Sequence, residues 1–396
     1  MKNAAIIAEY NPFHNGHLWQ IDELRRLGAD TVTVALGADF TQRGRPAAFS
    51  KYTRAKAALL CGADLVVELP LPFAAASARQ FAAGGVAVLA GLGCVDTLCF
   101  GAEQADTDAL WQLSALLASE EFARSLKAEL DKGVSWPAAR AAAAEAALPG
   151  AAKLLAGPNN ILGLAYLQAI REQNAPLAPL PLARQGAGHD SMTPADRFAS
   201  ASYLRRAMET GSLAALEPYV PKEALRLYEE DAAAGLVADE EAFSRSLLTV
   251  LRLLPAKTAA ALPSAGNEGL ANLLCTAAAG AANADELYTL MKSKRYTHAR
   301  LRRLALEGYL SMGADLPQKP AYLRVLGAGE KGIALLKEAK QTATLPVVFS
   351  LAEAKKLGAD AARLADLSAR AGALYGLCLK NPRPAGAEFT QKFIRV

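Results

Sequence analysis

The amino-acid sequence predicts an α/β protein, a doubly wound parallel sheet followed by a mainly α-helical domain. Through the first hundred residues, short apolar runs alternate with stretches whose apolar residues have helical spacing. Such alternation is typical of a parallel sheet with helices on both faces. After Arg206 the helical pattern continues without strands until a short apolar run at 345–349. Because 396 residues exceed one simple core, we expect domains at 1–210 and 211–396.

The individual elements follow from local pattern. The first helix is predicted from the spacing of Leu18, Ile21, Leu24 and Leu27, and two more helices follow at 51–61 and 74–89. An alanine-rich helical region covers 105–147, and the turn at 157–160 begins another helix. The predicted strands are 4–8, 31–36, 65–69, 95–100 and a proline-interrupted run at 177–182.

Composition excludes several classes of protein. The most apolar stretch, 81–100, contains four glycines and is interpreted as a buried helix and strand, so we expect no membrane span. The five cysteines are dispersed without metal-ligand spacing, which indicates reduced thiols, a cytoplasmic location and no metal site. Because the first residues already form a predicted strand, we expect no secretory signal. A net charge of +4 is mild, so any nucleic-acid contact requires local clustering.

The most informative segment is the turn at 10–17, Tyr-Asn-Pro-Phe-His-Asn-Gly-His. It joins the first strand to the first helix, where backbone N–H groups and the helix dipole hold phosphate. Pro12 stiffens the turn, and Gly16 lets a ligand approach closely. His14 and His17 lie at this anion site, and imidazolium groups could donate hydrogen bonds to phosphate. A lone histidine is usually an ordinary core or surface residue, but two of the four histidines lie in this one turn.

Three further segments are candidate parts of a nucleotide site, the first two at carboxyl ends of predicted strands. Gln42 and Arg43 follow the second strand, and Arg43 could clamp phosphate, although an ordinary surface arginine is an equal alternative. Gly101 ends the fourth strand, where a plain turn is the simpler interpretation. Ser200 and Ser202 begin a helix, with Arg205 one turn later, which is either a second phosphate site or a simple N-cap.

These motifs resemble the HIGH-type nucleotidylyltransferase superfamily and, within it, the tRNA(Met) cytidine acetate ligase family. The resemblance covers most of the chain. The matching segments are 9–17, 40–44, 100–101, 158–163, Arg184, 200–202 and 294–300.

The resemblance implies a Rossmann-like (HUP) catalytic domain and a ligase that activates acetate with ATP as acetyl-adenylate. The acetyl group would then pass to the wobble cytidine of elongator tRNA(Met), giving N4-acetylcytidine. It implies His14 and His17 as catalytic residues, and Gln42 and Arg43 on the phosphate or acetate side, with Mg²⁺ accompanying the ATP. Between Asn159 and Asn160, we favour Asn159 as the ATP contact. The ATP-binding residues that it implies are Ile7, Ala8, Glu9, Tyr10, Asn11, Pro12, Phe13, Asn15, Gly16, Leu18, Gln20, Gly101, Asn159, Asn160, Arg184, Ser200 and Ser202.

A basic segment in the helical half is a candidate tRNA-binding surface. Residues 292–303 include six Lys or Arg and no acidic residue. Such a stripe suits a phosphate backbone, and Tyr296 could stack on a base. A solvated basic face is the alternative interpretation. The candidate residues are Lys292, Lys294, Arg295, Tyr296, Arg300 and Arg303.

Two other functions remain open at this point. A small-molecule adenylyltransferase of the same superfamily would join AMP to a phosphorylated metabolite, but its usual members are much shorter. A non-catalytic nucleotide-binding scaffold is the other alternative, which the intact histidine pair disfavours. The sequence indicates no covalent nucleophile and no carboxylate cage for a metal, and it leaves the oligomeric state open.

Overall fold

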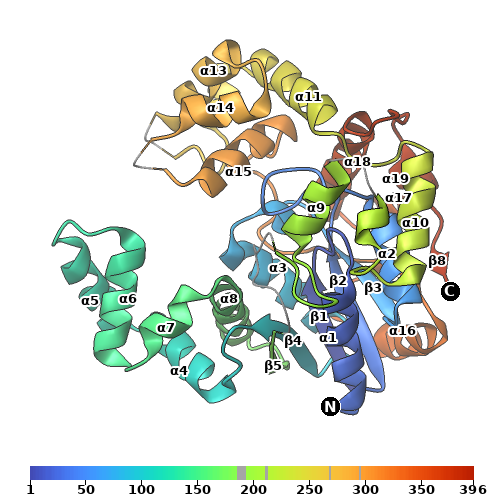
Figure 1. Ribbon diagram of the computed structural model, residues 1–396, viewed down its shortest axis with the longest axis horizontal. Coiled ribbons are helices and arrows are strands. Elements are labelled where there is room, and N and C mark those ends of the chain that lie inside the picture. Colours follow the sequence, from blue (N-terminus) through green and yellow to red (C-terminus); the bar gives the residue numbers. More distant parts are fainter. Residues whose placement is uncertain (185–192, 210–212, 267–268, 294–295) are drawn as a thin grey trace.

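One mixed sheet organises the molecule (Figure 1). The computed structural model describes residues 1–184, 193–209, 213–266, 269–293 and 296–396. Within this part the strand order is β5-β4-β1-β2-β3-β6-β7, with β8 also paired to β6. Strands β1 to β5 run parallel to one another, as predicted, whereas β6 is antiparallel to β3. The five parallel strands are β1 (Asn3–Ala8), β2 (Thr31–Gly37), β3 (Leu65–Leu69), β4 (Thr97–Ala102) and β5 (Ala178–Ala183).

Helices cover both faces of the parallel strands, so the doubly wound prediction is confirmed. Successive residues of a strand point to opposite faces. Ile6 accordingly packs in the core beneath α1 (Asn15–Arg26) and α2 (Lys51–Leu60), and Ile7 packs in the core beneath α3 (Ala78–Gly91) and α8 (Pro158–Glu172). Because both faces are covered, the central strands are almost continuously apolar rather than alternating.

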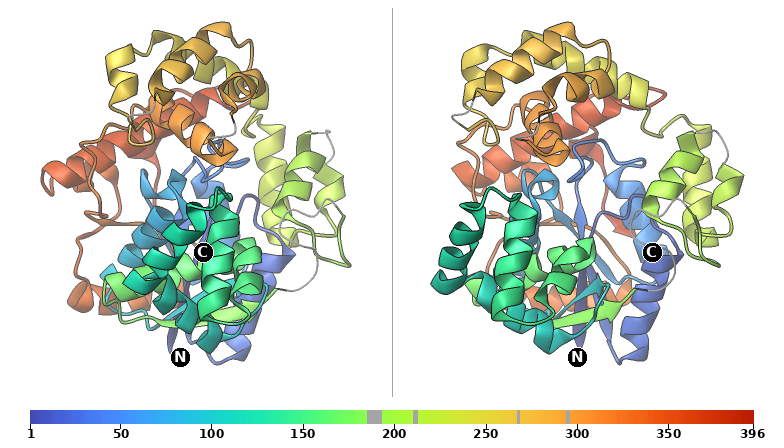
Figure 2. Two further views of the ribbon diagram at one scale, coloured as in Figure 1. Left: turned by 90° about the vertical axis from the view of Figure 1, so that its left-hand side faces the viewer. Right: turned by 60° about the vertical axis from the view of Figure 1, so that its left-hand side comes forward.

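Two helical regions flank the sheet (Figure 2). The first is formed by α4 (Thr107–Leu117), α5 (Glu120–Leu130), α6 (Trp136–Ala147) and α7 (Ala151–Ala156), which project beside β4 and β5. The second, called here the helical layer, lies above the carboxyl ends of the strands. The helical layer comprises α11 (Glu240–Leu253), α12 (Ala256–Ala260), α13 (Leu270–Gly280), α14 (Ala284–Met291) and α15 (His298–Tyr309). Helices α9 (Ala201–Glu209) and α10 (Lys222–Ala233) connect the sheet to this layer. No helix in the described part of the chain is long and apolar enough to span a membrane.

Strands from the last third of the chain join the same sheet as β1 to β5. The sequence-based division at residue 210 does not anticipate this pairing. The predicted strand near 345–349 is present as β7 (Val347–Val348), but β6 (Leu323–Ala328) was missed. Its sequence includes Arg324, a charge that interrupts the apolar run and obscures the strand pattern. The remaining elements are α16 (Glu330–Thr342), α17 (Leu351–Ala354), α18 (Ala359–Leu377), α19 (Ala387–Thr390) and β8 (Ile394–Arg395).

A buried ion cluster fixes this returning segment. Lys51 Nζ lies 2.6 Å from Glu68 Oε1 and 2.8 Å from Glu388 Oε2. Arg324 Nη1 lies 2.6 Å from Glu388 Oε2 and 3.2 Å from Glu68 Oε2. The four side chains are at most 5% exposed. Glu388 therefore joins α19 to both β6 and α2.

Replacing Glu388 with alanine should strongly destabilise the protein, because Lys51 and Arg324 would keep buried charges with one carboxylate fewer. Removing one partner of a buried pair typically costs about 3–5 kcal/mol. Urea unfolding at neutral pH measures this loss. The control Glu338→Ala removes an exposed carboxylate 3.9 Å from Lys2 and should change the free energy of unfolding by less than about 0.5 kcal/mol. Equal losses in both variants would contradict this account.

Candidate active site

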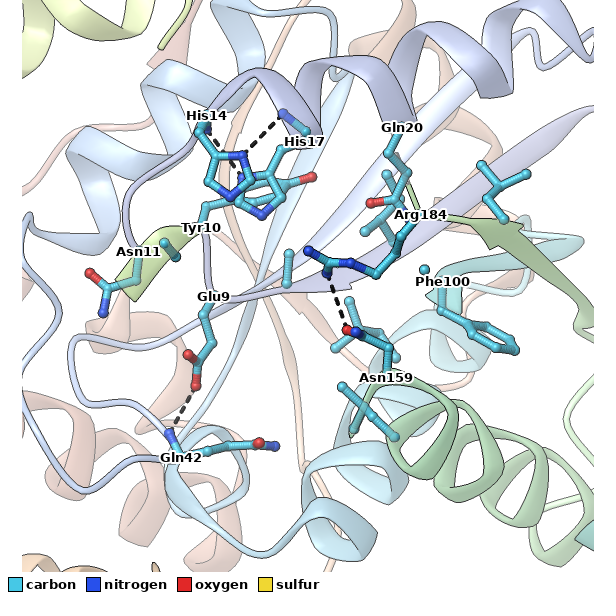
Figure 3. A pocket seen from close by; sticks show the side chains of 18 of the residues that line it. Glu9, Tyr10, Asn11, His14, His17, Gln20, Gln42, Phe100, Asn159 and Arg184 are labelled. Carbon is cyan, nitrogen blue, oxygen red and sulfur yellow. Dashed lines mark hydrogen bonds between the residues drawn. The ribbon is translucent and has the colours of Figure 1, made fainter. Parts of the chain in front are cut away.

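A cavity of about 300 Å³ lies at the carboxyl ends of β1 and β4, the usual ligand position in this class of fold. We call it the histidine cavity (Figure 3). The sequence-predicted residues that line it are Ile7, Ala8, Glu9, Tyr10, Asn11, His14, Gly16, His17, Gln20, Gln42, Arg43, Gly101, Asn159, Arg184 and Ser202. Residues far apart in the sequence thus form one site.

In the turn after β1, backbone N–H groups already have hydrogen-bond partners within the protein. Tyr10 is 1% exposed and has φ +46°, a left-handed conformation that is rare for a bulky residue and is held here by burial. Phe13 N donates to Tyr228 Oη at 2.9 Å, and Asn15 N donates to Tyr219 O at 2.8 Å. The turn's N–H groups at Phe13 and Asn15 therefore already have protein partners.

The two histidines form a reciprocal cap at the start of α1. Gly16 N donates to His14 Nδ1 at 3.0 Å, and His14 N donates to His17 Nδ1 at 3.2 Å. Since each Nδ1 accepts a hydrogen bond, each neutral ring carries its proton on Nε2. The glycine is required here, because a Cβ at Gly16 would lie 2.9 Å from His14 Cε1. The site therefore presents two Nε2–H donors.

Both imidazoles are neutral in this environment. Burial lowers the pKa of His14 to about 3, with further lowering by the charges of Arg184 and Arg205. Burial, then His14 and Arg184, lower the pKa of His17 well below its usual value. The rings stack with centroids 3.8 Å apart. Two expectations are thus corrected. The donors are neutral imidazoles rather than imidazolium, and the amides of Phe13, His14, Asn15 and Gly16 are occupied by the cap and its neighbours.

The opposite wall is built by the first turn of α8. Asn159 Nδ2 donates to Glu103 Oε1 at 2.6 Å, and Arg184 Nη1 donates to Asn159 Oδ1 at 3.3 Å. Asn160 is 0% exposed, and its Oδ1 accepts from the backbone N–H groups of Glu103 and Gln104. Asn159, which we favour as the ATP contact, therefore lines the cavity, whereas Asn160 holds the first turn of α8 and does not line the cavity.

The third wall carries charge. Arg205 Nη1 donates to Asn11 O at 2.7 Å, and its Nη2 donates to Ser202 Oγ at 3.1 Å. Glu9 Oε1 accepts from Gln42 N at 2.8 Å. Burial raises the pKa of Glu9 against the opposing effects of Gln42 N and nearby arginines, including Arg54. Among the described residues, no group of three or more His, Cys, Asp or Glu is placed to hold a metal ion.

This geometry agrees with the comparisons to known proteins. The model of the HIGH nucleotidyl transferase family matches residues 1–389. A protein of Acetivibrio thermocellus named tRNA(Met) cytidine acetate ligase is 35% identical, with 100% of both chains covered. One of the same name from a Geobacillus strain is 36% identical over 90% of each chain. The chain belongs to the tRNA(Met) cytidine acetate ligase family of HIGH nucleotidyl transferases.

Solved structures support the same assignment. A crystal structure of Thermotoga maritima TmcAL bound with alpha-thio ATP matches with a TM-score of 0.91 and 28% identity. The apo form of that protein matches with a TM-score of 0.93. Both comparisons cover 100% of each chain. The family assignment therefore extends to the fold of the whole chain.

Some of the predicted ATP-binding residues do not line the histidine cavity but hold the segments that form it. Phe13 is 0% exposed, Asn15 Nδ2 donates to Arg197 O at 3.0 Å, and Ser200 Oγ accepts from Tyr203 N at 3.0 Å as an N-cap. The predicted residues that do not line the cavity are Pro12, Phe13, Asn15, Leu18, Asn160 and Ser200. Sequence reasoning missed Phe81 and Tyr166, because these lie within α3 and α8 without a local motif.

The predicted tRNA-binding residues lie around the start of α15. Lys294 and Arg295 fall outside the described residues. Lys292 is exposed, and its Nζ donates to Tyr296 O at 2.9 Å. Tyr296 is only 6% exposed, with the Arg300 guanidinium 5.1 Å from its ring centroid. The expectation that Tyr296 stacks on a base is therefore wrong for this conformation, because its ring packs inside the helical layer. Arg303 is half-buried.

The neutral histidines make stability depend on pH. The unfolded chain binds a proton at His14 near its usual pKa of 6.5, whereas the folded chain binds it only near 3. The free energy of unfolding therefore falls as pH drops from 6.5 toward 3, by at most about 1.4 kcal/mol per pH unit from this group. His14→Asn keeps a cap acceptor without titrating and should flatten that slope in urea unfolding at several pH values. His298→Asn, at an exposed position, is the control, and an unchanged slope in His14→Asn would contradict the burial argument.

Proposed function

We propose that this protein is a cytoplasmic tRNA(Met) cytidine acetate ligase. It activates acetate with ATP as acetyl-adenylate and transfers the acetyl group to the wobble cytidine of elongator tRNA(Met), forming N4-acetylcytidine. The observation that carries this proposal is the pair of fixed Nε2–H donors at the histidine cavity. Its support is the similarity over the full chain to proteins of that name.

The first step joins acetate to AMP. An acetate oxygen attacks the α-phosphorus of ATP, and the bond to the pyrophosphate oxygen breaks. This step needs alignment and stabilisation of charge on phosphate oxygens. His14 and His17 supply preorganised neutral donors, and Arg43 and Arg205 supply positive charge. Among the described residues that line the cavity there is no cysteine or lysine, which agrees with direct attack by acetate.

The remaining lining residues suit the nucleoside. Gly101 leaves space beside the fourth strand, Phe100 and Tyr166 offer apolar surface, and Asn159 offers an amide. Arg184 lies between Asn159 and the histidines (Figure 3). Mg²⁺ would accompany ATP, held by phosphate oxygens and water, because Glu9 is the one carboxylate among the described lining residues.

Acetate-dependent exchange of labelled pyrophosphate into ATP tests the first step. We expect exchange with acetate and none with a panel of phosphorylated metabolites. Exchange with a phosphorylated metabolite but not with acetate would make the protein an adenylyltransferase of the same superfamily.

His17→Ala should lower acetate-dependent exchange by about a hundredfold or more, because it removes one preorganised donor. The free energy of unfolding of this variant should fall by only about 1 kcal/mol, the usual cost of a lost helix cap. Near-normal pyrophosphate exchange in this variant would show that His17 has a structural role and no catalytic one.

The start of α15 is the proposed tRNA-binding surface, and Lys292, Arg300 and Arg303 are those of its predicted basic residues that the structure describes. Replacing these three with alanine should weaken tRNA binding and lower the slope of log K against log salt, because fewer phosphates are neutralised. Fluorescence anisotropy with labelled tRNA at several salt concentrations measures both.

The control for this variant removes three exposed lysines of α16, Lys331, Lys337 and Lys340, which lies away from α15 (Figure 1). Acetate-dependent exchange should persist in both variants. Equal weakening by the two triple variants, or no weakening by the α15 variant, would place the RNA surface elsewhere.

A further inference from the structure

A second cavity, of about 640 Å³, adjoins the histidine cavity. We call it the junction cavity, because its lining comes from the sheet loops, α9, the helical layer and the C-terminal region. The two cavities share Glu9, Asn11, Arg43, Ser202 and Arg205. A group bound in one cavity can therefore reach a group bound in the other across this shared wall.

The helical layer closes over the junction cavity. Gly44 has φ +72°, and a Cβ there would lie 2.9 Å from Arg302 O on α15, so loop and helix are in direct backbone contact. Arg45 holds the same loop to the layer, with Nη1 3.1 Å from Glu240 Oε2 and Nη2 2.9 Å from Asp285 Oδ1. Arg302 belongs to the basic segment of α15 and lines the cavity. The cavity thus connects the proposed RNA surface with the site of acetate activation.

The lining fits a nucleotide. Besides Arg45, which pairs with Glu240 and Asp285, its cations are Arg43, Arg205, Arg206, Arg302 and Lys380, and these suit phosphate. Pro46, Val237 and Ala238 provide apolar surface for a base. Much of its acidic charge is already engaged, since Glu240 pairs with Arg45 and Asp239 Oδ1 accepts from Ala242 N at 2.8 Å. Glu9 lies on the wall shared with the histidine cavity, and a carboxylate is the side chain that accepts from the exocyclic amine of cytosine.

We propose that the junction cavity receives the target cytidine, turned out of its single-stranded RNA loop, and that Glu9 accepts the proton its exocyclic amine loses. This inference rests on the proposed function. Loop bases of RNA are commonly read in this splayed form. The cytosine amine would face the acetyl group of acetyl-adenylate across the shared wall.

The transfer step balances without a further reactant. The amine nitrogen attacks the acetyl carbonyl carbon and forms the C–N bond. The bond between that carbon and the phosphate oxygen breaks, and AMP leaves with the electron pair. The proton from nitrogen passes to the Glu9 carboxylate. Burial raises the pKa of Glu9, which makes it a stronger base than an exposed carboxylate.

Filling the junction cavity tests the binding half of this proposal. Ala238 lines the junction cavity and is not part of the histidine cavity. Its backbone N–H donates to Ala48 O at 2.9 Å, which Ala238→Leu retains. We expect this variant to keep acetate-dependent pyrophosphate exchange within about twofold and to lose acetyl transfer to tRNA by at least tenfold. Ala233→Leu, at an exposed position at the end of α10, should keep both activities.

The outcomes are distinguishable. Parallel loss of exchange and transfer in Ala238→Leu would overturn the inference, because the cavity would then serve the first step, for example by holding pyrophosphate. Normal transfer would also overturn it. Absence of acetate-dependent exchange in the unmodified protein would instead overturn the proposed function.

The role of Glu9 is tested by a ratio, because Glu9 also lines the histidine cavity. Glu9→Gln keeps an oxygen that can accept from Gln42 N, but it cannot take a proton. We expect the ratio of acetyl transfer to pyrophosphate exchange to fall about a hundredfold, a typical contribution of a general base. Glu9→Asp should restore part of that ratio. An unchanged ratio in Glu9→Gln would overturn the proton-accepting role.

Discussion

The site depends on one buried guanidinium, that of Arg54, which is 0% exposed. Its Nε donates to Phe49 O at 2.9 Å, Nη2 donates to Ala38 O at 2.8 Å, and Nη1 donates to the carbonyls of Gly37 and Glu9. The carbonyls of Glu9, Gly37 and Ala38 lie where β1 and β2 end, and that of Phe49 lies just before α2. A planar group with five N–H donors satisfies all four. Because the two loops share one cation, the histidine turn and the loop carrying Arg43 keep a fixed separation.

Buried charge extends this constraint to the end of the chain. Lys51 N donates to Asp39 Oδ1 at 2.6 Å, so the loop after β2 is also anchored at the start of α2. The side chain of the same lysine reaches Glu68 and Glu388. The favourable interaction with these carboxylates exceeds the opposing effect of burial and holds the pKa of Lys51 well above its usual value. The antiparallel β6 and the segment around α19 thus support the active-site loop, although neither lines the histidine cavity.

Local sequence was sufficient for the parallel strands and for the position of the histidine turn between β1 and α1. It failed where the outcome depends on distant partners. Arg324 lies in a strand because two glutamates from elsewhere compensate its charge, and a single-chain pattern shows only a charge in an apolar run. Tyr296 looks like a stacking residue in a basic window, but the helical layer buries it. The amides of the first turn are occupied because Tyr219 and Tyr228, more than two hundred residues away, contact them.

The neutrality of the histidine pair follows from the same packing and explains how the site can bind a polyanion. Stacked, buried rings beside Arg184 and Arg205 could not both carry charge without strong repulsion and loss of hydration. As neutral donors fixed by backbone N–H groups, they keep their orientation before the nucleotide arrives, so little reorganisation is needed as charge develops. Positive charge is supplied separately by arginines, which remain protonated at any physiological pH. Glu9 is the exception on this cationic wall. A carboxylate there opposes the binding of phosphate. Besides accepting from Gln42 N, it has a role in the proposed transfer step, in which a proton rather than a phosphate must be bound.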